Sequence, residues 1–298
     1  MRIGPTEIED TFAEAFGMRY CRLIVTACDG HWLAAATREA CGYGTSIIEC
    51  DAETGVEVPL TTDDSPDGRC AAACLFFGFS GEALAKAVGR RAGQCLMTCP
   101  TTAVFDGLPA AADRIDLGCR LRFFGDGFQK SKVIAGRRYW RIPVMDGEFL
   151  VEETAGIAKG VAGGNILIQT ADQPGGLAAL RRAVDAVAPL PGVITPFPGG
   201  GVRSGSKVGS RYQGLVASTA DAFCPTLMGL AGKVATRLHP AANCCYEIVI
   251  DGVSEAAVAA AMRAAIHAAA GEETLRISAG NYGGKLGKFH FHLRKLPP

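Results

Sequence analysis

Short runs of consecutive apolar residues alternate along the chain with longer segments whose apolar residues recur every three or four positions. The short runs predict buried strands, and the longer segments predict amphipathic helices. In the first half, strands are predicted at residues 21–27, from Ile47 onward and at 74–79, with helices at 31–41 and 82–91. Ser80 is the predicted N-cap of the second helix, whose Leu84 and Val88 point inward.

The second half repeats this alternation more clearly. Strands are predicted at residues 165–171, 193–195, 246–250 and 275–277, and helices at 176–188 and after the N-cap Ser254. The apolar stripes of these helices are Leu177, Leu180, Val184 and Val187 in the first, and Val258, Met262 and Ile266 in the second. Each half of the chain therefore contains two strand–helix–strand units.

Two such units in tandem predict the split βαβ, or ferredoxin-like, arrangement. The predicted fold class is α+β, with mainly antiparallel sheets and helices on one face of each. We expect two tandem lobes, residues 1–145 and 146–298, because the pattern is interrupted within residues 144–153. The C-terminal lobe carries the glycine-rich loops and Glu247.

The composition is that of a globular protein, with 48% hydrophobic and 20% charged residues, and it excludes an intrinsically disordered chain. The formal net charge is zero and no block of like charges occurs, so the sequence does not predict the concentrated basic face that nucleic-acid binding needs. The densest basic stretch, residues 137–141, is predicted to be an edge strand. The longest alanine-rich run, residues 256–270, is interrupted by Arg263 and His267 and is too short to span a membrane.

The cysteine pattern indicates a reducing compartment. Twelve cysteines, none in a C-x-x-C pair, predict free, mostly buried thiols rather than a zinc framework. The polar and acidic start of the chain predicts no secretory signal peptide. The expected location is therefore the cytoplasm.

The stretch GGGVRSGSKVGSRY, residues 199–212, resembles a phosphate-binding loop but departs from it. Ser206 stands where that motif requires lysine, Lys207 comes one position late, and residues 208–212 are poor helix starters. A second glycine-rich loop, SAGNYGGKLG at 278–287, occupies the equivalent place after its strand, and a third segment lies at 160–165. Glycine-rich segments that carry two lysines suit a binding site for a flat anionic ligand. The alternative is that the glycines serve only tight turns and close packing.

Three kinds of side chain offer candidate chemistry. Glu247 lies within an apolar strand, where burial would raise its pKa and allow it to donate a proton near neutral pH; the alternative is an outward-facing glutamate on a half-exposed strand. His290 and His292 share one strand face, and we expect them to point outward without binding metal. A thiol nucleophile is available among the cysteines Cys95, Cys99 and Cys224.

Several motifs together carry a family resemblance. They are EIEDTFAEAF (7–16), GYGTS (42–46), PDGR (66–69), GQCLMTCPT (93–101), FFGDGF (123–128), GVAGGN (160–165), PFPGGGVRSGSKVGS (196–210), CPTL (224–227), YEIVIDG (246–252) and SAGNYGGKLG (278–287). The chain resembles formylmethanofuran:tetrahydromethanopterin N-formyltransferases nearly from end to end. Its neutral charge and many cysteines resemble the version in methylotrophic bacteria, a subunit of a formyltransferase/hydrolase complex in one-carbon metabolism, in which formaldehyde is oxidised to formate.

The resemblance implies direct transfer of a formyl group between a methanofuran-type amine and N5 of tetrahydromethanopterin, both acting as substrates, with no metal and no tightly bound cofactor. It implies a homotetramer, a larger complex with hydrolase-type subunits, and Glu247 as the catalytic acid. The substrate-binding residues it favours are Arg203, Ser204, Ser206, Lys207, Asn281 and Lys285. Backbone N–H groups of the glycine-rich loops are expected to assist. The alternatives are a thiol acyltransferase and a non-catalytic assembly subunit.

Overall fold

The chain forms two compact units. The computed structural model describes residues 1–207, 212, 214, 220–228, 230 and 235–296. Unit 1 comprises Met1–Gly17 and Val161–Pro298, and unit 2 comprises Met18–Gly160. The long strands β3 (Phe12–Ala27) and β11 (Thr154–Thr170) contribute residues to both units. The lobe boundary predicted at residues 145/146 lies at the turn of a hairpin, and it stays a prediction.

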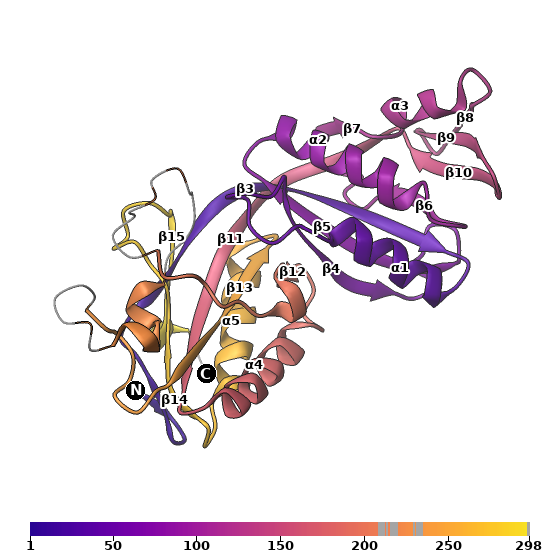
Figure 1. Cartoon of the computed structure of the whole chain (residues 1–298). Helices are drawn as coiled ribbons and strands as arrows, with labels where there is room; N and C mark the ends of the chain where they lie inside the picture. Colours follow the sequence, from indigo (N-terminus) through magenta and orange to yellow (C-terminus); the bar gives the residue numbers. More distant parts are fainter. Residues whose placement is uncertain (208–211, 213, 215–219, 229, 231–234, 297–298) are drawn as a thin grey trace. The chain divides into compact units, whose positions relative to one another are not determined.

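Unit 2 is built around a sheet with helices α1 and α2 against it (Figure 1). The strand order is β4 (Glu53–Leu60), β5 (Cys70–Gly78), β3, β6 (Ala103–Asp106), β10 (Gly147–Glu152), β9 (Arg137–Val144) and β8 (Lys130–Ile134). All pairs are antiparallel except β10 with β6. The strand β7 (Asp113–Asp116) pairs with the start of β11.

The two helices predicted in unit 2 are present and begin within one residue of the predicted positions, as α1 (Gly30–Cys41) and α2 (Gly81–Arg91). A short helix that was not predicted, α3 (Gly118–Leu121), follows, with a π-helical turn at Ala92–Leu96 and a 3-10 turn at Arg122–Gly125. Ser80 caps α2 by accepting a hydrogen bond from the N–H of Ala83 at 3.1 Å, and Leu84 and Val88 are buried. Side-chain oxygens satisfy N–H groups that a helix start leaves unpaired, which explains why this cap is readable from sequence.

Two predictions for unit 2 are wrong. The strand expected from Ile47 begins only at Glu53, because the N–H groups of Glu49 and Cys50 bond to the carbonyl of Ser46 and form a turn. Residues 137–141 are not an edge strand, since β9 lies between β8 and β10. The arginine charges there are balanced by acidic neighbours: Arg137 Nε donates to Glu152 Oε1 at 2.6 Å.

Unit 1 contains a second set of strands. Its strand order is β1 (Arg2–Ile3), β2 (Thr6–Ile8), β14 (Thr274–Ser278), β11, β13 (Cys244–Gly252) and β12 (Val193–Ile194). Among these six strands, only β14 and β2 pair in parallel. The strand β15 (Phe289–His292) pairs with the first residues of β3. The helices are α4 (Gln173–Val187) and α5 (Glu255–Ala269), with 3-10 turns at Pro198–Gly200, Asp221–Phe223, Pro225–Leu227 and Leu293–Lys295.

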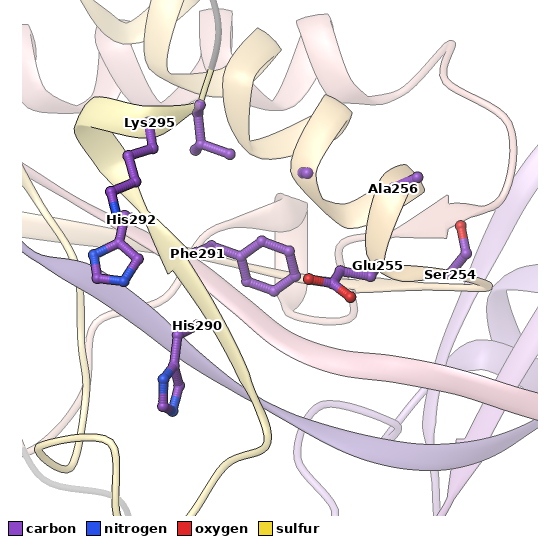
Figure 2. Close-up of a pocket in the computed structure, with 9 residues that line it drawn as sticks. Ser254, Glu255, Ala256, His290, Phe291, His292 and Lys295 are labelled. Carbon is purple, nitrogen blue, oxygen red and sulfur yellow. The ribbon is translucent and has the colours of Figure 1, made fainter.

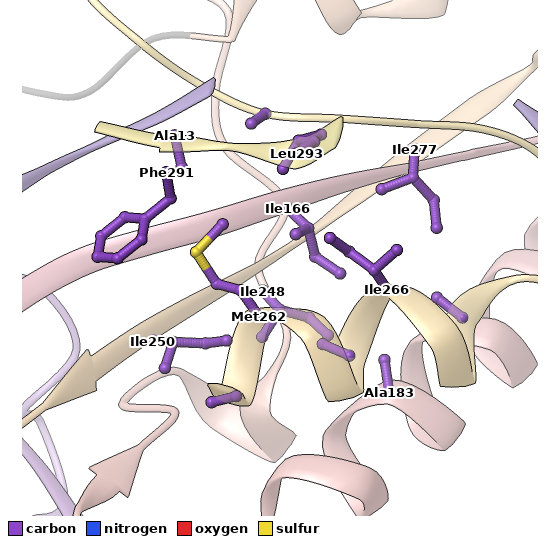
Figure 3. Packing of buried hydrophobic residues seen from close by; sticks show 14 of the residues in the cluster. Ala13, Ile166, Ala183, Ile248, Ile250, Met262, Ile266, Ile277, Phe291 and Leu293 are labelled. Atoms are coloured by element: carbon purple, nitrogen blue, oxygen red, sulfur yellow. The ribbon is translucent and has the colours of Figure 1, made fainter. Parts of the chain in front are cut away.

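Both long helices of unit 1 pack on one face of its sheet. Figure 3 shows Ile166, Ile248 and Ile250 meeting Met262 and Ile266 of α5 in this core. Because side chains alternate along a strand, the residues between these isoleucines point to the opposite face of the sheet. The prediction that α5 buries Val258, Met262 and Ile266 is confirmed.

The predicted stripe of α4 is wrong in one position. Leu177 is 49% exposed, while α4 buries Gly176, Ala179 and Ala183 instead. The cause is close packing, since a Cβ atom on Gly176 would lie 2.6 Å from the ring of Tyr246. Glycine and alanine are only weakly hydrophobic, so the apolar period of the sequence placed Leu177 in the buried stripe in preference to these small residues.

The histidines of β15 lie outward, as predicted. His290 and His292 are exposed, while Phe291 between them is buried. All twelve cysteines are free, as predicted, but most are half-buried and not buried: three are buried, eight half-buried and one exposed.

Among the described residues, no helix is both long and apolar enough to cross a membrane.

Candidate functional site

Glu247 lies in β13 on the face of the unit 1 sheet opposite the helices. The side chain of the next residue, Ile248, points to the other face of the sheet, where it belongs to the core shared with α4 and α5. On one side it pairs with Leu167 of β11. On the other side it pairs with Val202: the N–H of Val202 donates to the Glu247 carbonyl at 2.8 Å, and the Glu247 N–H donates back at 3.0 Å. This pairing brings the glycine-rich stretch after β12 beside the glutamate.

The Glu247 carboxyl is the strongest candidate for acid chemistry in unit 1. Burial raises its pKa from 4.5 to about 7, against an opposing hydrogen bond from Ser204. The Ser204 hydroxyl donates to Glu247 Oε2 at 3.2 Å. A carboxyl with a pKa near neutrality is populated in both protonation states, so it can donate and later recover a proton. The alternative of an ordinary, ionised surface glutamate does not fit this environment.

A row of side chains crosses the sheet from Glu247. Leu167 pairs with Glu247 on one side and with Ser278 of β14 on the other, which places Glu247 and Ser278 about 10 Å apart across two strand spacings. Ser278 is fully buried, and its hydroxyl has no hydrogen-bond partner among the described residues. Buried polar groups are rarely left unpaired, and an ordered buried water is the usual partner of such a hydroxyl.

Gln169 is a second polar residue on this face. It is fully buried, its Oε1 accepts the N–H of His239 at 2.6 Å, and its Nε2 has no partner in the described part of the chain. Leu167, two residues earlier, packs against Phe223 and Leu238, which cover this end of the face. Gln169 and Ser278 were not predicted from the sequence. The available signal was a polar residue inside an apolar strand, the same signal that identified Glu247.

Of the predicted binding residues in the first glycine-rich stretch, Ser204 contacts Glu247 directly. Arg203 is exposed, and Ser206 and Lys207 are half-buried. Burial raises the pKa of the Tyr246 phenol, and the positive charge of nearby Arg203 opposes that rise. Lys207 adopts a positive φ of 39°. Residues 208–211, predicted not to start a helix, lie outside the described residues.

The second glycine-rich loop holds Asn281 and Lys285. The Asn281 amide nitrogen donates to the Thr11 hydroxyl at 3.2 Å and to the Phe12 carbonyl at 2.9 Å. Lys285 is exposed. Four backbone N–H groups of this loop bond to the carboxylate of Glu14. These four N–H groups are therefore not free to assist the reaction, because a carboxylate of the chain already occupies them. The same expectation for the first glycine-rich stretch stays a prediction.

The third glycine-rich segment is not a loop. Residues 160–165 lie inside β11, where the pairing with β13 is interrupted by a bulge. The N–H of Gly163 donates to Asp251 Oδ1 at 2.9 Å. A Cβ atom on Gly164 would lie 2.3 Å from Val258, so close packing explains this glycine.

The predicted thiol candidates are poorly suited to nucleophilic catalysis. Burial raises the pKa of the thiols of Cys95, Cys99 and Cys224 above the ordinary value. The nucleophilic form of cysteine is the thiolate, so these thiols are less reactive at neutral pH than a free cysteine. Within the described ranges, no group of three or more histidine, cysteine or acidic residues is placed to hold a metal ion.

A separate groove lies on another side of unit 1. It has a volume of about 610 Å³ and is lined by the start of α5, by β15 and by the turn after it. Figure 2 shows His290 and His292 projecting from β15 while Phe291 points toward Glu255. None of the predicted site residues lines this groove.

Replacing Ser204 by alanine should raise the pKa of Glu247. The hydroxyl stabilises the charged carboxylate, and one such hydrogen bond contributes about 0.5–1.5 kcal/mol, or roughly 0.5–1 pH unit. NMR titration of the Glu247 carboxyl carbon measures the change. Ser206→Ala, in the same stretch, is the control and should leave the pKa unchanged. An unchanged or lower pKa in Ser204→Ala would show that this hydrogen bond is not formed in solution.

Family models match both halves of the chain. Residues 1–144 match the model described as formylmethanofuran-tetrahydromethanopterin formyltransferase, and residues 147–296 match the one described as FTR, proximal lobe. A relative of the same name from Methylobacillus flagellatus is 53% identical over 303 residues, covering 99% of both chains. One subunit of the formyltransferase/hydrolase complex of Methylorubrum extorquens is 47% identical, covering 97% of this chain and 95% of the relative.

Two solved structures have the same fold. The formylmethanofuran:tetrahydromethanopterin formyltransferase of Methanosarcina barkeri superimposes with a TM-score of 0.93 at 44% identity, over 100% of both chains. A chain of the formyltransferase/hydrolase complex of Methylorubrum extorquens, solved with methylofuran, gives a TM-score of 0.94 at 45% identity, over 99% of this chain and 98% of the other. These matches define the chain as a formyltransferase, an enzyme of one-carbon metabolism. It belongs to the formylmethanofuran–tetrahydromethanopterin formyltransferase family.

Proposed function

We propose that this chain transfers a formyl group between a furan-type primary amine and N5 of tetrahydromethanopterin on the Glu247 face of unit 1. The observation that carries the proposal is a carboxyl whose burial raises its pKa to about 7. The family membership supplies the substrates, and the carboxyl supplies the acid that such a transfer needs. Both substrates bind together, and neither a metal nor a tightly bound cofactor takes part.

The proposed chemistry is direct addition and elimination. The N5 lone pair attacks the formamide carbon, and the neutral carboxyl of Glu247 donates its proton to the carbonyl oxygen as negative charge develops there. The proton that N5 loses as the adduct forms passes to the nitrogen of the furan carrier. When the adduct collapses, the carbonyl re-forms, the bond to that nitrogen breaks, and the carrier leaves as the free amine. Glu247 recovers its own proton from the oxygen, so protons balance over the cycle.

The binding roles proposed for the loop residues follow from their charge and position. Arg203, Lys207 and Lys285 would bind acidic groups of the substrate tails, and Ser206 and Asn281 complete the proposed set. Ser204 would act through Glu247 as well, since its hydroxyl contacts the carboxylate at 3.2 Å. The pairing of Val202 with Glu247 supports a role for this whole stretch.

We further propose that both lobes are ferredoxin-like. The strand order β14-β11-β13-β12, with α4 and α5 between strands in the chain, supports this assignment for unit 1. The order β6-β3-β5-β4, with α1 and α2 in the same places, supports it for unit 2. In each set all strand pairs are antiparallel, as in a split βαβ repeat.

A homotetramer in the cytoplasm is the proposed assembly, together with a larger complex containing hydrolase-type subunits. The larger complex is supported by a curated relative and a solved structure from the formyltransferase/hydrolase complex of Methylorubrum extorquens. The second candidate function is a non-catalytic assembly subunit of such a complex. The relatives that are named as formyltransferases favour the catalytic function over it.

The purified chain should form 5-formyltetrahydromethanopterin from a formylated furfurylamine donor and tetrahydromethanopterin. Product formation by the chain alone is followed by chromatography and compared with the chain bound to its partner subunits. Complete alkylation of the cysteines should leave this activity in place, which separates direct transfer from a thiol acyltransferase. Absence of product from a folded chain that still joins the complex would favour the assembly subunit.

A further inference from the structure

Glu14 is a buried acidic residue that the proposed chemistry does not use. It lies in β3 at the edge where β15 pairs, opposite His290, and only 2% of its surface is exposed. Its Oε2 accepts the N–H groups of Tyr282 at 2.7 Å and Gly284 at 2.8 Å. Its Oε1 accepts those of Leu286 and Gly287, both at 2.6 Å. An ionised carboxylate has about four acceptor positions, so all of them are filled.

The loop formed by residues 280–287 is folded around this carboxylate. Gly283 and Gly284 have φ values of 71° and 72°, which residues with side chains rarely adopt. A Cβ atom on Gly287 would lie 2.5 Å from the carbonyl oxygen of Ala15. Several backbone N–H groups of one loop that point to the same place form an anion-binding concavity. Here the anion is part of the protein, so the loop has a fixed shape without a ligand.

The loop begins beside the proposed active face. It follows Ser278, which shares a row of the sheet with Leu167 and Glu247. Asn165 of β11 fixes its first residue, because Asn165 Oδ1 accepts the N–H of Gly280 at 2.6 Å and Nδ2 donates to the Gly280 carbonyl at 3.2 Å. The loop therefore leaves the sheet about two strand spacings, roughly 10 Å, from the catalytic carboxyl.

Three side chains of the loop are exposed, while its backbone N–H groups point to Glu14. Tyr282 is 49% exposed, Leu286 is 64% exposed, and Lys285 is exposed. An aromatic ring, an apolar side chain and a cation on a rigid support suit a flat ring system that carries an acidic group. Fixing such groups before binding reduces the entropy lost when the ligand binds.

We propose that Glu14 is a positioning residue, which holds the 280–287 loop in the shape that binds the acidic, ring-bearing substrate beside Glu247. This inference rests on the proposed function, because it assigns the loop to the same site. Glu14 touches neither the substrate nor the reacting atoms. Its effect is on substrate affinity through the loop, and the acid chemistry of Glu247 is independent of it.

The test replaces Glu14 by glutamine, which keeps the size but removes the charge and places an NH2 group against N–H donors. In Glu14→Gln, hydrogen exchange at the amides of residues 282, 284, 286 and 287 should become about 10- to 100-fold faster, since their charged acceptor is lost. KM and the directly measured Kd for tetrahydromethanopterin should rise about tenfold or more, while kcat changes by less than about threefold. The pH dependence of kcat should not move.

Glu273→Gln is the matched control, because Glu273 is an acidic residue of the same unit that pairs with Arg182 and not with the loop. It should leave exchange in the loop, KM and Kd unchanged. Glu14→Asp keeps the charge with a shorter reach, and it should give intermediate exchange rates and affinity. It also serves as the test protein should Glu14→Gln not fold.

Two results would overturn the proposal. One is faster exchange in the loop with unchanged Kd and KM, which would remove the loop from the substrate site. The other is a fall in kcat at constant KM that matches the loss of folded protein. That result would show that Glu14 only stabilises the fold. Failure of the proposed function would give a different result, because the wild-type chain would then form no product. Hydrogen exchange in the loop and the Kd for tetrahydromethanopterin could still be measured for both Glu14→Gln and the wild type.

Discussion

Glu247→Gln should lower the rate of formyl transfer by roughly 10²–10⁴-fold, the usual contribution of one acid–base group. Glutamine has nearly the same shape as glutamate and keeps a hydrogen bond to Ser204, but it has no acidic proton to give to the carbonyl oxygen. We expect the loss in kcat, with KM for both substrates changed by less than about threefold. Steady-state kinetics with a formylated furfurylamine donor and tetrahydromethanopterin measure both constants.

The control is Glu272→Gln, which removes one negative charge from an exposed position of the same unit. It should transfer the formyl group at the wild-type rate. Circular dichroism should show both variants folded. Wild-type kcat in Glu247→Gln would exclude Glu247 as the acid and overturn the proposed chemistry.

Much of the fold could be predicted because its signals are local. The caps Ser80 and Ser254 each accept an N–H three residues later, as expected at the start of a helix. The run of apolar residues around Glu247 predicted its strand, and the 3.6-residue period of apolar residues predicted the stripe of α5. The failures have a different origin. Leu177 is exposed because α4 is packed through glycine and alanine, and that contact depends on Tyr246, some 70 residues away in the chain.

The candidate site was predictable in part for the same reason. A glutamate in an apolar strand is visible in the sequence, and its pKa of about 7 follows from the burial that this context implies. Glu14 could not be found this way, because its partners lie 268 to 273 positions away along the chain. The sequence shows a glycine-rich loop that could hold an anion. Only the pairing of β3 with β15 shows that the anion is Glu14.

Two carboxyl groups of unit 1, those of Glu247 and Glu14, have pKa values shifted in opposite directions. Burial raises the pKa of Glu247 to about 7. Burial also acts to raise the pKa of Glu14, but the four N–H groups of the loop outweigh it and lower the pKa to about 2. The folded protein therefore holds a proton on Glu247 more tightly than the unfolded chain does, and on Glu14 less tightly. Each group makes folding stability depend on pH, in a different window and with a different sign.

Glu247→Gln should make the protein more stable than wild type at pH 8, by up to about 3 kcal/mol. Because the folded pKa of Glu247 is about 7 against 4.5 for an ordinary glutamate, its stabilising protonated form is fully present below pH 4.5. That contribution is lost as the pH rises through 7, where the wild type must bury a charge and the glutamine variant does not. Urea unfolding at several pH values measures the difference in free energy of unfolding.

The difference between the two proteins should be small at pH 4.5 and should grow steadily up to pH 8. Glu272→Gln, at an exposed position, should show no such trend. A constant difference across this range would mean that Glu247 titrates as an ordinary surface glutamate, and the acid role would then have no physical basis. A growing difference together with a large loss of kcat would show that the group needed for catalysis also destabilises the fold. That combination is expected when a catalytic group is kept in an environment unfavourable to its charged form.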